Sequence, residues 1–210
     1  MPREFYNDNE TSKSLDVLNG LAKKVDFVLI GGWAVNFYVN MQKSKDVDIA
    51  IDTEQLPYFK KYGIQDYGEI GIKYSLIDGT YVDLFIEGVA DEDITIPVKK
   101  ILATTNVIRG IKVVDESVLL LLKMGGYFRE ERDKQRKDVI DVVTLLFYGR
   151  VNLRTVKKYV EEYKIDKRKG FGGVLEYIDK AETMWDYITD TKEEYVRLKE
   201  RYKKEIRKLY

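Results

Sequence analysis

The chain has 210 residues, of which 34 % are charged, and its 36 Lys+Arg are balanced by 36 Asp+Glu. It contains no Cys and no His, which excludes disulfides, zinc sites of the Cys/His type, Cys nucleophiles and His general bases. Any chemistry must therefore use carboxylates, lysines, hydroxyls and hard metal ions. The lack of Cys favours an intracellular, cytoplasmic protein, and no apolar run approaches the roughly 20 residues of a membrane span.

Short strand-like runs, turns and helices alternate in the first half of the chain. An apolar run is followed by Gly31-Gly32 and a helix-like stretch, a second run alternates with period two, and two further runs flank Asp78-Gly79. An Asp-Gly pair between alternating runs is a strong signal of a β-hairpin. In chain order, the expected elements are a strand at 26–30, a helix at 33–40, a strand at 46–52, and hairpin arms at 70–77 and 80–86.

The pattern becomes helical from Asp115 onward. The expected helices lie at 116–128, 134–148, 153–164, 172–188 and 192–208. We therefore predict an α/β domain over residues 1–114 and a helical domain over 115–210. The first carries 13 Lys+Arg and 17 Asp+Glu, the second 23 and 19, so the basic second half slightly favours a polyanionic partner.

Acidic residues share one face of the strand predicted at 46–52. Alternation places Asp46 and Asp48 on this face and apolar residues on the other. If the second hairpin arm lies beside this strand, Asp83 joins them. Three carboxylates on adjacent strands form an all-oxygen site suited to Mg²⁺ or Mn²⁺. The same spacing also fits a solvated strand edge.

The glycine step upstream suits a phosphate. A junction of strand, Gly31-Gly32 and helix offers backbone N–H groups at the positive end of a helix dipole. Lys43 and Ser44 add a cation and a hydroxyl before the acidic strand. Paired glycines are also common in ordinary turns, so this feature needs its context.

Taken together, the segment GGWAVNFYVNMQKSKDVDIAID and the later YVDLFI resemble the signature of the nucleotidyltransferase superfamily. The Gly-Gly-Trp-Ala form is similar to small bacterial and archaeal members, including antibiotic nucleotidyltransferases and AbiEii-type toxin nucleotidyltransferases. The resemblance implies a nucleotidyltransferase-like α/β (α+β) fold, in which a mixed sheet with flanking helices is followed by a helical C-terminal domain. Lys43 departs from the more common Arg, and the bulky Trp33 stands where other members have a small hydroxyl residue.

The resemblance also implies roles for individual residues. Asp46, Asp48 and Asp83 would be catalytic and would bind Mg²⁺ or Mn²⁺. The nucleotide would be bound by Gly31, Gly32, Lys43, Ser44, Lys123 and Asp138, with Asp138 or Asp141 shaping the site.

The leading interpretation is a nucleotidyltransferase that moves a nucleoside monophosphate from a nucleoside triphosphate such as ATP to a hydroxyl. The acceptor is open among RNA, protein and a small molecule, and the resemblance adds a toxin–antitoxin role with an antitoxin partner. A second interpretation is a catalytically silent nucleotide- or partner-binding module. The third is a structural α/β protein without a site.

Two features of the helical half also have alternative interpretations. A basic cluster fits either a nucleotide or RNA surface or a solvated helix face. Lys137 and Asp141 at i,i+4 fit a surface pair, and the alternative is the site role that the resemblance implies for Asp141. An apolar stripe along the last helix is expected to pack within the chain. The cluster comprises Arg129, Arg132, Lys134, Arg136 and Lys137, and the stripe comprises Tyr195, Leu198, Tyr202, Ile206 and Leu209.

Overall fold

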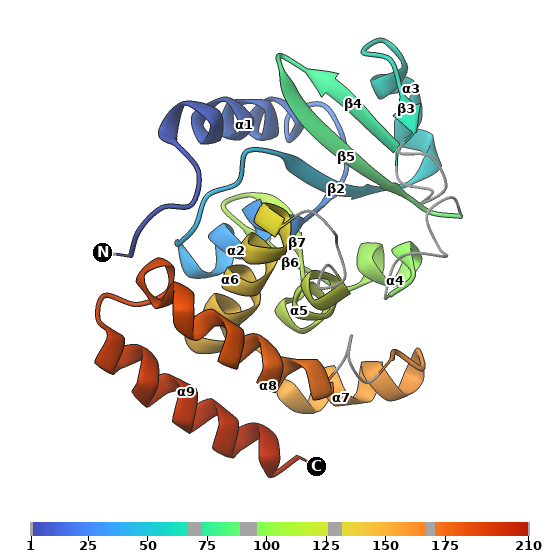
Figure 1. Cartoon of the computed structure of the whole chain (residues 1–210). Helices are drawn as coiled ribbons and strands as arrows, with labels where there is room; N and C mark the ends of the chain where they lie inside the picture. Colours follow the sequence, from blue (N-terminus) through green and yellow to red (C-terminus); the bar gives the residue numbers. More distant parts are fainter. Residues whose placement is uncertain (1, 67–72, 89–95, 126–131, 167–170, 210) are drawn as a thin grey trace. The chain divides into compact units, whose positions relative to one another are not determined.

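The computed structural model describes residues 2–66, 73–88, 96–125, 132–166 and 171–209 (Figure 1). The chain divides into two compact units. A sheet unit contains residues 6–37 and 43–115, and a helical unit contains 1–5, 38–42 and 116–210. Two short segments from the first half of the chain therefore belong with the helices.

The sheet unit is built on a seven-stranded mixed sheet in the order β3-β4-β5-β2-β1-β7-β6. β2 pairs with β5, and β1 with β7, in parallel, whereas the other neighbours are antiparallel. The strands are β1 (Val28–Ile30), β2 (Val47–Ile51), β3 (Gln65–Asp66), β4 (Lys73–Ile77), β5 (Thr80–Ile86), β6 (Thr105–Ile108) and β7 (Ile111–Val114).

Alternation along β2 separates a core face from the face that carries an acid. Val47, Ile49 and Ile51 are fully buried, whereas Asp48 between them is only half-buried. Because successive side chains of a strand point to opposite faces, the apolar residues hold β2 in the core while Asp48 lies on the other face.

The predicted hairpin is confirmed. Asp78 and Gly79 have φ angles of 49° and 80°, and the strand partners Ile77 and Thr80 close the two-residue loop. Positive φ at both central positions defines a type I′ turn, whose twist matches that of the flanking strands.

Helices accompany the sheet, beginning with one that the sequence analysis does not predict. Asn7 caps this helix, α1, by accepting a hydrogen bond from the backbone N–H of Glu10 at 3.0 Å. The elements are α1 (Asp8–Leu21), α2 (Gly31–Val39), the 3₁₀ helix η1 (Thr53–Gln55), α3 (Leu56–Lys60) and α4 (Val98–Ala103). The β6–β7 hairpin, which turns at Arg109 and Gly110 with positive φ, is also not predicted.

The helical unit confirms most of the predicted helices. They are α5 (Glu116–Gly125), α6 (Arg132–Tyr148), α7 (Leu153–Glu162), α8 (Phe171–Lys180), the 3₁₀ helix η4 (Ala181–Tyr187) and α9 (Lys192–Arg207). The single helix predicted at 172–188 is wrong, because regular α-helix ends at Lys180 and Met184 has a non-helical φ of −126°.

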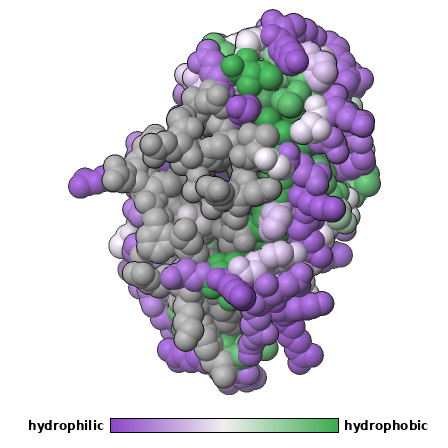
Figure 2. Space-filling model, turned by 90° about the vertical axis from the view of Figure 1, so that its right-hand side faces the viewer, coloured by the Kyte–Doolittle hydropathy of each residue, from purple (hydrophilic) through white to green (hydrophobic). Residues whose placement is uncertain are grey.

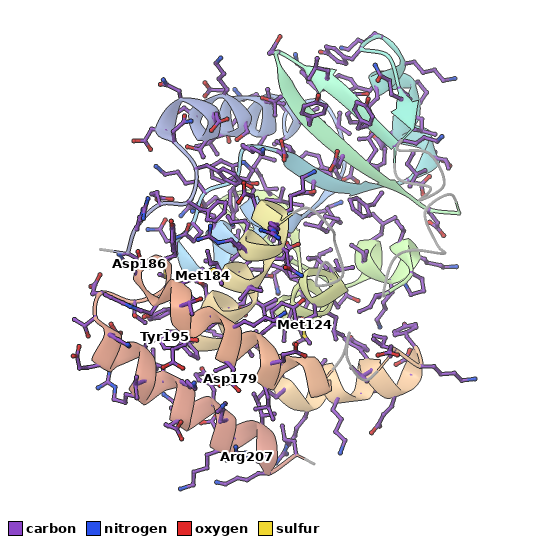
Figure 3. All side chains as sticks on the ribbon, in the orientation of Figure 1. Met124, Asp179, Met184, Asp186, Tyr195 and Arg207 are labelled. Carbon is purple, nitrogen blue, oxygen red and sulfur yellow. The ribbon has the colours of Figure 1, made fainter. Side chains whose placement is uncertain are left out.

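The apolar stripe of α9 packs within this unit, as predicted. Tyr195, which is labelled in Figure 3, is fully buried. Its ring centroid lies 5.5 Å from that of Phe147, and its hydroxyl donates to the carbonyl of Ile178 on α8. The hydroxyl of Tyr177 donates to the carbonyl of Met124 at 2.9 Å and so joins α8 to α5. Within the described residues, no helix has the length and apolar character needed to cross a bilayer.

The predicted α/β fold class is thus confirmed: a mixed sheet with flanking helices is followed by a set of C-terminal helices.

Candidate active site

Asp48 and Asp83 are direct partners across the parallel pair β2–β5. Neighbouring strands lie roughly 4.8 Å apart, and register partners on adjacent strands present their side chains on the same face. Both residues are half-buried. The pairing that the sequence analysis could state only as a condition therefore exists.

Asp46 occupies a different local position. It is half-buried and lies one residue before the start of β2, in a bend. Among the residues that the structure describes, no group of three acidic side chains is close enough to hold a metal ion. The structure therefore brings two of the three predicted carboxylates together as strand neighbours.

The amino end of α2 lies against the carboxylate of Asp48. Gly31, the first residue of α2, has a φ of 69°, and a Cβ added there would lie only 1.9 Å from Oδ2 of Asp48. Only glycine allows this approach. The partial positive charge at a helix N-terminus attracts a nearby anion, and the Asp48 carboxylate lies at this end of α2.

The oxygen-only donor set of Asp48 and Asp83 fits a magnesium ion. Mg²⁺ is usually held by one or two carboxylates and completes its shell with water and substrate phosphates. Two adjacent acids beside a glycine that leaves room for the carboxylate match this requirement. Asp48 and Asp83 would hold the ion, and Asp46 lies two residues before Asp48 in the sequence.

The segment before β2 is anchored to α1 and α2. Nζ of Lys43 pairs with Oδ1 of Asp8 at 2.8 Å. The carbonyl of buried Ser44 accepts from Oγ of Ser14 at 2.6 Å, and Oγ of Ser14 accepts from Nε1 of Trp33 at 3.1 Å. Sequence reasoning missed Ser14, although a buried tryptophan N–H needs an acceptor. Trp33 thus helps to position the segment that carries Lys43 and Ser44.

Lys123 and Asp138 belong to a buried charge cluster in the helical unit. Nζ of Lys123 lies 3.1 Å from Oδ1 of Asp138 and 2.8 Å from Oδ2 of Asp141, and Lys137 also pairs with Asp141. All four side chains are buried or nearly so; that of Asp141 is fully buried. Burial lowers the pKa of Lys137, against the opposing effect of Asp141.

The burial of this cluster corrects the interpretation of Lys137 and Asp141 as a surface pair. The side chain of Lys137 is only 6 % exposed, which also removes it from the basic surface cluster. Arg129 of that cluster lies outside the described residues, as do Asp91 and Asp93, a second Asp-x-Asp pair.

A surface hollow of about 570 Å³ is lined by none of the predicted site residues. Its walls come from α9 and the residue after it: Glu200, Arg201, Lys204, Arg207 and Lys208.

Comparison with solved structures finds distant structural likenesses. No family model matches the sequence, and no curated protein matches it. Among solved structures, the chain is similar to "ANT(2")-Ia in complex with adenylyl-2"-tobramycin", with 12 % identity, a TM-score of 0.43, and coverage of 74 % of this chain and 97 % of that one. It is also similar to JHP933 from Helicobacter pylori, with 14 % identity, a TM-score of 0.49, and coverage of 97 % and 96 %. At these values neither likeness carries an inference about activity.

Proposed function

We propose that the chain is a metal-dependent nucleotidyltransferase that moves a nucleoside monophosphate from a nucleoside triphosphate to a hydroxyl acceptor. The observation that supports it most is the register pairing of Asp48 and Asp83 beside the glycine start of α2. This arrangement combines two neighbouring carboxylates on one sheet face with a helix N-terminus. Such a combination suits a metal–triphosphate substrate.

In the proposed reaction, the acceptor oxygen forms a bond to the α-phosphorus while the bond from that phosphorus to the bridging oxygen breaks. Pyrophosphate leaves, and the carboxylate of Asp83 accepts the acceptor proton. Backbone N–H groups at Gly31-Gly32 and the hydroxyl of Ser44 bind phosphate oxygens. Asp48 and Asp83 would hold a Mg²⁺ ion, which would supply charge neutralisation for the phosphates and acidify the acceptor hydroxyl.

The nucleotide contacts proposed for Lys43, Lys123 and Asp138 do not follow from the pairing of Asp48 with Asp83. Lys43 would have to give up its ion pair with Asp8 in order to bind a phosphate, and an exposed ion pair contributes little to stability. The nucleotide role of Lys123 and Asp138 rests on the sequence resemblance alone.

Calorimetric titration with Mn²⁺ tests the metal site. The substitution Asp48→Asn should weaken Mn²⁺ binding at least tenfold, equivalent to about 1.4 kcal/mol. The control is Asp78→Asn, which removes an exposed carboxylate at the hairpin turn, where asparagine tolerates the positive φ. Equal Mn²⁺ affinity in Asp48→Asn and the control would refute the site.

Labelling with α-labelled triphosphates tests the reaction. Incubation with RNA, protein and small-molecule fractions should label one fraction only when Mg²⁺ or Mn²⁺ is present. Asp83→Asn should reduce the labelling rate about a hundredfold or more, as expected for loss of a general base, while Asp78→Asn keeps it. Triphosphate binding without metal, and without labelling of any fraction, would instead identify a silent nucleotide-binding module.

A toxin role in the cytoplasm, with an antitoxin partner, is a further part of the proposal that rests on the AbiEii-type resemblance. Induced expression in a bacterium should slow growth for the wild-type chain but not for Asp48→Asn. Equal growth of the two strains at equal protein levels would remove the toxin role and leave the transfer reaction untouched.

A further inference from the structure

A row of side chains crosses four strands at the level of the carboxylates. The register joins Gln65 to Tyr74, Tyr74 to Asp83, and Asp83 to Asp48. Since register partners share a face, Tyr74 is the direct neighbour of Asp83 on the side away from Asp48. The sheet face that carries the acids therefore continues into aromatic side chains.

Tyr81 enlarges this aromatic surface. It precedes Asp83 by two residues on β5 and so lies on the same face. The ring centroids of Tyr74 and Tyr81 lie 5.6 Å apart at 52°, and the hydroxyl of Tyr74 donates to Oε1 of Gln65. Tyr81 is 47 % exposed, and its strand partner Leu76 is 48 % exposed. We call Tyr74, Leu76 and Tyr81 the aromatic platform.

Figure 2 views the side on which β3 and β4 lie in Figure 1, and hydrophobic groups are visible there among hydrophilic ones. The platform consists of only three side chains, whereas a stable protein interface buries roughly 800 Å² on each partner. Two tyrosine rings with a leucine beside them instead match the size of a single planar ring. Stacking on aromatic side chains is the usual way in which proteins hold unpaired bases.

We propose that the aromatic platform binds the nucleobase of a terminal nucleotide in the acceptor, and that Tyr74 and Tyr81 are its positioning residues. This inference rests on the proposed function and specifies its acceptor as a single-stranded nucleic acid end. One strand spacing, roughly 4.8 Å, separates Tyr74 from Asp83. A base stacked on the platform therefore places its ribose hydroxyls beside the carboxylate that accepts the proton.

Fluorescence anisotropy with a short fluorescein-labelled oligoadenylate tests the inference in the presence of Mn²⁺. Tyr81→Ala should weaken binding about tenfold, since stacking contributes roughly 1–3 kcal/mol per base, and Tyr81→Phe should retain most of it. Tyr148→Ala is the matched control, because Tyr148 is 39 % exposed at the end of α6. A labelled abasic oligomer, which keeps the phosphates but lacks the rings, should bind weakly to every variant.

Several results would overturn the inference. One is equal oligoadenylate binding by Tyr81→Ala and wild type, and another is equal binding of the abasic oligomer and oligoadenylate. A third is loss of the Mn²⁺-dependent thermal shift with nucleoside triphosphate in Tyr81→Ala, since the platform would then hold the donor base. If wild type shows no triphosphate shift but binds oligoadenylate through Tyr81, the proposed function fails while the platform is supported.

Discussion

Any side chain at position 31 would be unfavourable for two separate reasons. The φ of 69° at Gly31 is unfavourable for other residues, and the carboxylate of Asp48 occupies the space of a Cβ. The first reason concerns backbone strain, which costs about 1–2 kcal/mol for an L-residue. The second concerns the candidate site, because any Cβ must displace Asp48.

We expect Gly31→Ala to lower stability and to abolish the Mn²⁺-dependent triphosphate shift, measured by thermal unfolding. The matched control is Gly79→Ala, since Gly79 has a φ of 80° but no atom within 4 Å of the added Cβ. The control should lose stability through backbone strain yet keep the shift. If both variants keep an equal Mn²⁺-dependent thermal shift with triphosphate, Asp48 is not part of the metal–triphosphate site.

At the scale of the helix pair α5–α6, the main feature is a cluster of buried charges. Asp141 has no exposed side-chain surface and pairs with both Lys123 and Lys137. A buried ion pair need not stabilise a fold, but removal of one partner leaves the other charge buried without compensation.

We expect Asp141→Asn to reduce the free energy of unfolding by roughly 3 kcal/mol, measured by urea denaturation. The control is Glu205→Gln, which removes the acid from an exposed i,i+4 pair with Arg201 and should cost about 0.5 kcal/mol or less. A similar loss in both variants would show that the cluster around Asp141 is solvated.

The contact between α8 and α9 has a predictable pH dependence. Oδ1 of Asp179 pairs with Nζ of Lys203 at 2.6 Å and with Nζ of Lys199 at 2.9 Å. Burial acts to raise the pKa of Asp179, but the hydrogen bonds from the two lysines outweigh it and lower the pKa below its usual value. A carboxyl whose pKa is depressed by folding adds stability above its unfolded pKa, and this stability is lost as the pH falls through the folded pKa.

The wild type should therefore unfold at a higher urea midpoint than Asp179→Asn at neutral pH. The gap between the two midpoints should close as the pH falls below about 4, the ordinary pKa of an aspartate. The carboxylate is half exposed, so the gap should be small. A gap that is independent of pH would mean that Asp179 acts through packing and not through its charge.

At the scale of the whole molecule, the chain enters the helical unit before its C-terminal half. Residues 1–5 and 38–42 belong to that unit, and Gln42 joins them. Its amide donates to the carbonyls of Arg3 and Tyr187, each at 2.7 Å, and its Oε1 accepts from the N–H of Phe5 at 3.1 Å. Gln42 is 2 % exposed and therefore secures three chain segments in one place.

We expect Gln42→Ala to cost about 2 kcal/mol, because its partners lose their hydrogen bonds in a buried setting. For a chain of this length, the melting temperature should fall by roughly 4–8 °C. Gln55→Ala, which removes one bond to the exposed N–H of Asp26, should change it little. If the two variants have the same melting temperature, residues 1–5 do not contribute to the stability of the helical unit.

Local patterns in the sequence were sufficient for the features that depend on neighbouring residues. Asp78-Gly79 predicts its hairpin because both residues tolerate positive φ, and β2 buries its apolar residues because alternation sets its two faces. Most helices from 116 onward follow from their apolar period, but the break after Lys180 does not. The opening helix Asp8–Leu21 was missed although Asn7 is a good N-cap, and Arg109-Gly110 is an unusual turn pair.

Only the tertiary structure decided which strands pair and which charges are buried. Spacing in the sequence places Asp48 and Asp83 each on a strand face, but their register partnership depends on β2 and β5 meeting in parallel. Likewise, i,i+4 spacing pairs Lys137 with Asp141 in any helix, whereas its burial depends on the helices packed around it. Local sequence determines backbone conformation and the direction of side chains, whereas register and burial arise from contacts between segments far apart in the chain.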